Sequence, residues 1–287
     1  MYTFTYRHYG KQADVLKHLA LCEVLKNEKL RNYVETNSAC ALYNMQHSPE
    51  QQYGIYHFLS KAIEIESLKE SVYNELESIS IKNDCYLGSP GLAMAILESS
   101  VDNYFFFDIE SGPLESVKDF AQGKGLTDKV KTFNCESIEG TMKLLPTLPV
   151  SSFIHIDPYM INVKNSSGHT YLDIFIRASR IGMKCLLWYG YMTMEDKANV
   201  NRYIIDNLKA NNVKRSVCVE LFLNAIDQSS VNGNPGVLGS GLLTANLSDK
   251  SNATILDFTE KLADIYKDSE YNGFDGTLLK DIVYGYI

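Results

Sequence analysis

The strongest constraint on the fold is the alternation of short apolar segments with longer helical segments along the chain. Strands separated by helices of about ten or more residues are typical of βαβ units, which build a mostly parallel sheet with helices on both faces. The apolar strands agree with this, because the two faces of such a sheet are covered. We expect strands at 32–36, 104–108, 130–134, 152–157, 183–189, 214–223, 241–246 and 281–286, and helices at 12–30, 89–99, 112–122, 136–145, 170–180, 194–211 and 253–267.

A helical segment interrupts this alternation after the first strand. Residues 49–82 show two amphipathic helical patterns, at roughly 50–64 and 66–80, rather than a strand pattern. The chain resumes its alternation with a helix in which Ser89 is a plausible N-cap and Pro90 the first helical residue. We therefore expect one domain over residues 1–287, with a helical insertion subdomain at about 45–86.

Charge and composition limit the classes of function. The net charge of −8 argues against broad, non-specific adhesion to phosphate backbones. A local excess of three positive charges at residues 1–31 leaves two interpretations open, a basic contact site or a solvated amphipathic helix.

The sequence shows no apolar run of about 18 residues and no secretory signal at its N-terminus, so we expect a cytoplasmic protein without a membrane span. Six scattered cysteines indicate free thiols, and we expect no metal site.

Polar residues follow several of the predicted strands. In parallel sheets the ligand lies beyond the carboxyl ends of the strands, so these residues are candidates for a binding site. Asp108 ends one strand, where a carboxylate can accept hydrogen bonds from both ribose hydroxyls of a nucleoside, or else cap a turn. Glu136 follows the next strand, where it can accept the exocyclic amine of adenine, or else act as an acid at the start of a helix.

The sharpest feature is Asp157-Pro158-Tyr159, at the end of an apolar strand. It is similar to the (Asp/Asn/Ser)-Pro-Pro-aromatic loop of enzymes that methylate exocyclic amines. In that loop the acid and a prolyl carbonyl hold the amine by hydrogen bonds, and the aromatic ring stacks on the base. Positioning then supplies most of the rate, without a strong base. On its own the triplet is typical of a turn, and its position at a strand end favours the functional interpretation.

Several segments together carry a resemblance to one family. The chain resembles the RlmJ (YhiR-type) family, which methylates N6 of an adenine in bacterial 23S ribosomal RNA. The matching segments keep the family's order over almost the whole chain, and the helical insertion falls where that family has one. They are Tyr6-Arg7-His8, Ala13-Asp14-Val15-Leu16-Lys17-His18, Gly88-Ser89-Pro90, Ile156-Asp157-Pro158, Leu187-Trp188-Tyr189, Glu220-Leu221 and Gly239-Ser240-Gly241.

The resemblance implies a Rossmann-like class I methyltransferase that uses S-adenosyl-L-methionine and binds ribosomal RNA. It implies that Asp157 is the catalytic acid. The cofactor-binding residues that it implies are Lys17, His18, Asn37, Ser89, Asp108, Glu136, Ser137 and Asp157. The implied substrate-binding residues are Tyr6, Pro158 and Tyr159.

Two loops depart from the family's pattern. The family's first loop is glycine-rich, of the form D-T-H-A-G-A-G, whereas residues 35–41 read E-T-N-S-A-C-A. Glycine allows close approach to a ligand and positive φ, which alanine and serine adopt less freely. In the catalytic loop, Tyr159 takes the place of the second proline and Met160 that of the stacking aromatic residue. Methionine can still contact an adenine face through its sulfur.

These departures leave three interpretations open. The first is an active adenine-N6 methyltransferase acting on 23S ribosomal RNA. The second is a catalytically weakened, nucleic-acid-binding relative with a role in the use of external DNA. The altered loops favour it, and it is opposed by the retained Asp157, Ser89, His18 and Tyr6. The third is a methyltransferase with another substrate, such as DNA or a small amine.

Overall fold

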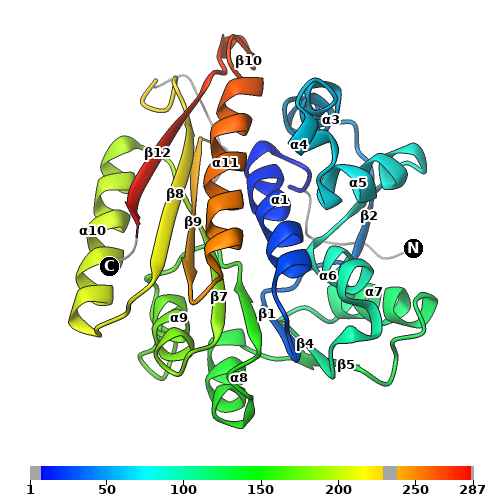
Figure 1. Cartoon of the computed structure of the whole chain (residues 1–287), viewed down its shortest axis with the longest axis vertical. Coiled ribbons are helices and arrows are strands. Elements are labelled where there is room, and N and C mark those ends of the chain that lie inside the picture. The colour runs from blue at the N-terminus through cyan, green and yellow to red at the C-terminus, as the bar shows by residue number, and fades with distance from the viewer. Residues whose placement is uncertain (1–7, 229–237, 286–287) are drawn as a thin grey trace.

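The computed structural model describes residues 8–228 and 238–285, so Tyr6 lies outside the described residues. Eight strands form the central sheet (Figure 1). They are β1 (Asn32–Thr36), β4 (Asn103–Asp108), β5 (Val130–Asn134), β6 (Phe153–Ile156), β7 (Lys184–Tyr191), β8 (Ser216–Leu223), β9 (Gly239–Ala245) and β12 (Leu278–Gly285). Their order is β12-β8-β9-β7-β6-β1-β4-β5. The predicted mostly parallel sheet is thereby confirmed.

The strand directions place a topological switch point between β1 and β6. β1 pairs in parallel with β4 on one side and with β6 on the other, and β5 and β7 extend the sheet in parallel beyond them. β9 runs antiparallel between β7 and β8, and β12 runs antiparallel to β8. In the register of β1 and β6, Thr36 pairs with Ile156. The residues that follow these two strands therefore come side by side where ligands bind in open α/β sheets.

Helices cover both faces of the sheet, as predicted. They are α1 (Gln12–Asn27), α6 (Ser89–Leu97), α7 (Ser111–Gly123), α8 (Ser137–Leu144), α9 (Tyr171–Arg180), α10 (Met194–Ala210) and α11 (Asp249–Ile265). Figure 1 shows α11 and α1 side by side on the same face of the sheet, and α1 also packs against α6. No helix among the described residues is long and apolar enough to cross a membrane.

Helix α1 is the most deeply covered of these elements. Every residue from Gln12 to Leu25 is buried, including the charged side chains Asp14, Lys17 and Glu23. The interpretation of this segment as a solvated amphipathic helix is therefore wrong. The three buried charges have polar partners, as a buried charge requires. Lys17 pairs with Asp14, and Glu23 accepts a hydrogen bond from the backbone N–H of Val72.

The helical insertion is more broken than its sequence pattern indicates. In place of one helix over 50–64, the structure has α2 (Pro49–Gln51), a π-helical turn and α3 (His57–Ala62), and α4 (Glu66–Lys69) and α5 (Val72–Lys82) follow. Gly54 lies in the π-helical turn, with ψ at −109°. A Cβ atom on Gly54 would lie 2.1 Å from the carbonyl oxygen of Gly10, so only glycine allows this approach to the start of α1.

Short strand pairs were not predicted. β2 (Leu42–Asn44) and β3 (Cys85–Leu87) pair in antiparallel fashion at the two ends of the insertion. β10 (Glu270–Tyr271) and β11 (Phe274–Asp275) form a second small pair after α11. Runs of two or three residues are too short to give a readable alternation of apolar and polar side chains.

The start of α6 differs from the sequence prediction. Gly88 is the N-cap residue and Ser89 the first helical residue, so Ser89 does not cap this helix. Its hydroxyl group instead donates a hydrogen bond to the carboxylate of Glu35. This contact directs Ser89 toward the end of β1.

Candidate active site

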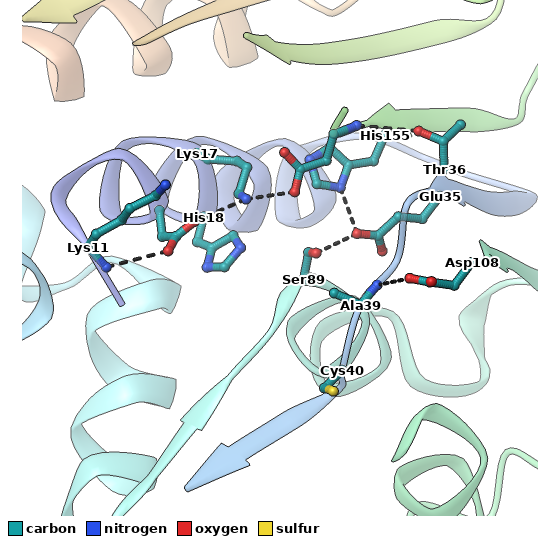
Figure 2. Close-up of polar contacts among 12 residues, drawn as sticks. Lys11, Lys17, His18, Glu35, Thr36, Ala39, Cys40, Ser89, Asp108 and His155 are labelled. Atoms are coloured by element: carbon teal, nitrogen blue, oxygen red, sulfur yellow. Dashed lines mark hydrogen bonds and ion pairs between the residues drawn. The ribbon is translucent and has the colours of Figure 1, made fainter. Parts of the chain in front are cut away.

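Polar residues gather in a cavity of about 220 Å³ at the switch point. Figure 2 shows Lys17 and His18 on α1 facing Ser89 and the end of β1. Six of the predicted site residues line the cavity: Lys17, His18, Asn37, Ser89, Asp157 and Tyr159. Asp108, Glu136, Ser137 and Pro158 are not among its lining residues.

Lys17 and Asp157 form the central ion pair of this cavity. The Lys17 Nζ atom lies 2.7 Å from Asp157 Oδ2 and 3.1 Å from Asp14 Oδ1. Burial opposes the charge of Lys17, but the two carboxylates outweigh it and raise the pKa of Lys17 well above its ordinary value. Lys17 therefore stays protonated. Asp14 fixes the position of its ammonium group, which in turn holds the Asp157 side chain in one orientation at the end of β6.

His18 is a buried, neutral member of the site. Its Nδ1 atom lies 2.8 Å from the hydroxyl oxygen of Tyr86, and the two rings stack. Burial, together with the positive charge of Lys17, lowers the pKa of His18 well below its ordinary value. A neutral imidazole at this position can form hydrogen bonds but supplies no positive charge.

A buried polar network supports the cavity from below. The carboxylate of Glu35 accepts hydrogen bonds from Ser89 and, at 2.8 Å, from the hydroxyl of Tyr33. His155 Nδ1 lies 3.1 Å from the same carboxylate, whereas His155 Nε2 has no partner among the described residues. His155 is thus an interior histidine with a partner at only one of its two ring nitrogens in the described part of the chain. The network fixes Glu35 and Ser89 beneath the ligand position.

The first loop adopts left-handed backbone conformations without any glycine. Asn37 has φ 52° and Ala39 has φ 51°. Asp108 stabilises this loop, because its carboxylate accepts hydrogen bonds from the backbone N–H of Ala39 at 2.9 Å and of Glu110 at 2.8 Å. Asp108 thus caps the loop, which was the alternative to ribose binding.

Tyr171 joins two predicted residues that are far apart in sequence. Its hydroxyl oxygen accepts a hydrogen bond from Asn37 Nδ2 at 2.8 Å and lies 3.1 Å from the hydroxyl of Ser137. Sequence reasoning missed Tyr171, because the first residue of a helix carries no local signal of this contact. The other amide atom, Asn37 Oδ1, is buried and has no partner in the described part of the chain.

Glu136 acts as the N-cap of α8. Its carboxylate accepts hydrogen bonds from the backbone N–H groups of Ile138 and Glu139, at 3.0 and 2.8 Å, and one from Asn165. The geometry thus shows the helix-start alternative for this residue. Among the described residues, no three potential metal ligands of the His, Cys, Asp and Glu types cluster together.

The fold and the site together define a class of protein. The central strands β5-β4-β1-β6-β7 run in parallel, β9 is reversed between β7 and β8, and the polar cavity lies at the switch point. This is the architecture of the class I S-adenosylmethionine-dependent methyltransferases, as predicted from the sequence.

Comparison with known proteins shows which methyltransferases the chain resembles. No family model matches the chain. The chain is 23% identical to ribosomal RNA large subunit methyltransferase J of Haemophilus influenzae over 260 residues, which cover 83% of this chain and 84% of the relative. A solved structure of a protein from Legionella pneumophila superposes with a TM-score of 0.71 and 21% identity, covering 97% of this chain and 98% of that one. The resemblance to the family of methyltransferase J is thereby confirmed.

The residues present suit the cofactor of this class. S-adenosylmethionine carries ammonium and ribose donors, and the unpartnered Asn37 Oδ1 atom in the cavity is an acceptor for such a donor. Ser89 lines the same cavity. The cavity of about 220 Å³ is smaller than the roughly 300–1,000 Å³ of most ligand pockets, so binding requires its lining to open.

Proposed function

We propose that this chain transfers a methyl group from S-adenosylmethionine to RNA, and that the acceptor is N6 of an adenine in 23S ribosomal RNA. The observation that carries the proposal is the position of Asp157. It follows β6 at the switch point, lines the cavity and is held there by Lys17 at 2.7 Å. A fixed carboxylate at the edge of a ligand cavity is what the positioning of an exocyclic amine for methylation requires.

Asn37 and Ser89 are the residues that we expect to hold the cofactor, and Asp108 shapes the loop that carries Asn37. Bound there, S-adenosylmethionine supplies an electrophilic methyl group on its sulfonium. Asn37 accepts a donor of the ligand through Oδ1 while Tyr171 keeps its amide in place. Asp108 keeps the backbone of the first loop in the conformation that shapes this side of the cavity.

Asp157 and Pro158 are the residues that we expect to hold the acceptor. The Asp157 carboxylate and the Pro158 carbonyl each accept a hydrogen bond from the amine, which directs its lone pair into the cavity. Because Lys17 is already bound to Asp157, the acid acts by orientation rather than as a strong base. Tyr159 is 68% exposed next to this point and is available to stack on the base.

The curated relative, which is named for ribosomal RNA, supports RNA as the substrate class. A target adenine within folded RNA has to leave its stack to reach Asp157, which lies in a cavity rather than on an open surface. The intact pair of Lys17 and Asp157 favours the enzyme over a non-catalytic relative that binds external DNA. An abandoned active site would not need to keep two opposite charges buried together.

The test combines ligand binding with methyl transfer. We expect S-adenosylhomocysteine to bind the wild-type protein in calorimetric titration, and unmodified large-subunit RNA to acquire N6-methyladenosine, measured by nucleoside analysis. Asp157→Ala is expected to lower the transfer rate by about 10²-fold or more, because an oriented hydrogen-bond acceptor is lost. S-adenosylhomocysteine binding should change little in this variant.

Asp128→Ala, which removes an exposed acid before β5, is the matched control and should transfer at the wild-type rate. Full activity of Asp157→Ala would remove Asp157 from the mechanism. If millimolar S-adenosylhomocysteine did not bind the wild-type protein, the proposed function as a whole would fail.

A further inference from the structure

The central sheet brings an indole ring next to the ion pair of the cavity. In the register of β6 and β7, Ile156 pairs with Leu187. The residues one step further along, Asp157 and Trp188, therefore lie side by side and point to the opposite face from that pair, because side chains alternate along a strand. Helix α1 lies on this face, and its Lys17 contacts both of them.

The face of the indole ring lies against the Lys17 ammonium group, which also contacts two carboxylates. Its Nζ atom lies 5.5 Å from the centre of the Trp188 ring, 2.7 Å from Asp157 Oδ2 and 3.1 Å from Asp14 Oδ1. An ammonium group has three N–H donors, and the two carboxylates account for two of them. An aromatic face is partially negative and attracts a cation within about 6 Å of its centre. Trp188 thus adds an attractive surface without adding a hydrogen-bond acceptor.

Burial strengthens this contact. Trp188 and Lys17 are each 7% exposed, so water shields them little from each other. The attraction between a cation and an aromatic ring is about two- to fourfold larger at desolvated sites than at exposed ones. A buried ammonium group has also lost most of its hydration, and its remaining neighbours must replace that hydration.

The indole contributes its face rather than its N–H group. A buried tryptophan N–H usually donates a hydrogen bond, but Trp188 Nε1 is buried and has no partner among the described residues. Lys11, at the N-cap of α1 (Figure 2), lies over the same ring, with Nζ 6.0 Å from its centre. In the described part of the chain, cations over the ring are therefore the polar contacts of this side chain. A purely apolar core position does not require them.

We propose that Trp188 is a positioning residue for methyl transfer, whose indole face keeps the Lys17 ammonium group where it orients Asp157. This inference rests on the proposed function and extends it to β7, the strand next to the one that carries the acid. Trp188 does not line the cavity, so it acts through Lys17. Weakening its face should lower the rate of the chemical step and leave ligand affinities nearly unchanged.

The test uses the fact that Trp188 is the only tryptophan of the chain. Growth on fluorinated tryptophans therefore modifies this residue alone in the full-length protein. Each ring fluorine withdraws electron density and weakens the attraction for a cation, while the shape of the indole hardly changes. We expect kcat for RNA methylation to fall stepwise from tryptophan to the trifluoro form, by about tenfold in all. The affinity for S-adenosylhomocysteine should change by less than about twofold.

Two lysine variants of α1 supply the control for this series. Lys17→Met removes the cation, so fluorination should no longer change the activity that remains. Lys26→Met removes a lysine of the same helix whose side chain is 49% exposed, and the stepwise decline should persist in this background. An equally steep decline in Lys17→Met would mean that fluorine acts through packing, and it would overturn the inference.

¹⁹F NMR of the monofluoro protein tests the contact independently of activity. Its single signal should shift when Lys17→Met removes the ammonium group and stay in place in Lys26→Met. An unmoved signal in Lys17→Met would refute the contact. This comparison also applies if Lys17→Met proves too slow for the rate measurement.

Conservative replacement separates the aromatic face from bulk. Trp188→Phe keeps a smaller aromatic face and should retain kcat within about threefold of the wild type, whereas Trp188→Leu should lower it about tenfold or more. Equal losses in the two variants would contradict the proposal. A flat fluorine series in a protein that methylates RNA would refute this inference alone. Absent S-adenosylhomocysteine binding would refute the proposed function, and the ¹⁹F comparison would still decide whether Trp188 contacts the Lys17 cation.

Discussion

At the scale of single residues, the first loop shows how this chain forms a ligand-binding turn without glycine. Ala39 holds φ at 51°, a left-handed conformation in which a Cβ atom crowds the following carbonyl oxygen. Asp108 compensates for this strain by accepting a hydrogen bond from the Ala39 N–H group. The loop therefore depends on a side-chain contact and not on glycine.

Ala39→Gly is expected to raise the free energy of unfolding by about 0.5–1 kcal/mol, because it removes the left-handed strain and keeps the N–H donor. Urea denaturation followed by circular dichroism measures the change. Ala41→Gly is the matched control, since Ala41 is buried in the same loop and has no positive φ. This second variant should lower the free energy of unfolding by a similar amount. A change of the same sign in both variants would contradict this explanation.

The site residues differ in how well the sequence reveals them. Asp157 was predictable, because a polar residue after an apolar strand stands out against its neighbours. The capping roles of Asp108 and Glu136 were among the alternatives, but sequence patterns do not determine where a carboxylate points. The roles of Tyr171 and Trp188 were not predictable, because both depend on contacts between segments distant in the chain.

At the scale of elements, the insertion helix α5 is anchored by a buried acid. Glu77 has no exposed surface, and its carboxylate accepts a hydrogen bond from the backbone N–H of Leu87 at 3.2 Å. Burial raises the pKa of Glu77 well above its ordinary value. The folded protein therefore retains a proton that the unfolded chain releases above about pH 4.3.

The expected consequence is a pH-dependent destabilisation. A folded-state pKa above the unfolded value means that stability falls as pH rises above about 4.3 toward the folded pKa, by up to about 1.4 kcal/mol per pH unit. Glu77→Gln removes this dependence, so its free energy of unfolding should exceed that of the wild type increasingly from pH 5 to 8. Urea titrations across that range measure the difference. Glu75→Gln, at an exposed position of the same helix, should follow the wild-type pH dependence.

The elements of the sheet and its covering helices were predictable, because short apolar runs and helical patterns of period 3.6 are readable in the sequence. Their ends shifted by a few residues, as for α1, which ends at Asn27 rather than at residue 30. The π-helical turn at Gly54 was not predictable. Its conformation follows from close packing against Gly10, which no local pattern expresses.

At the scale of the whole molecule, the segment after α1 is bound to the start of α11. The Glu28 carboxylate, whose side chain is 5% exposed, accepts hydrogen bonds of 2.7 Å from the Ser248 N–H group and from the Ser251 hydroxyl. Burial opposes the charge of Glu28, but these hydrogen bonds lower its pKa below the ordinary value. The contact joins the end of α1 to the start of α11, its neighbour on the same face of the sheet.

Glu28→Ala is expected to lower the free energy of unfolding by about 1–3 kcal/mol at pH 7, because two donors lose a charged acceptor. A lowered folded pKa means that the contribution is present above about pH 4.3 and is lost as pH falls through the folded pKa. Denaturation at pH 7 and pH 3.5 checks both points. Glu260→Ala, which removes an exposed ion pair with Lys280, should cost about 0.5 kcal/mol or less.

The contact between Glu28 and Ser248 also has a consequence for biosynthesis. These residues are 220 positions apart, so at about 5–20 residues per second roughly 10–45 s separate their synthesis. Throughout that interval α1, which is buried from Gln12 to Leu25 in the finished protein, has no α11 to cover it. The side of α1 that packs against α11 therefore stays uncovered until translation is nearly complete, and we expect chaperones that shield this side to raise the yield of folded protein in cells.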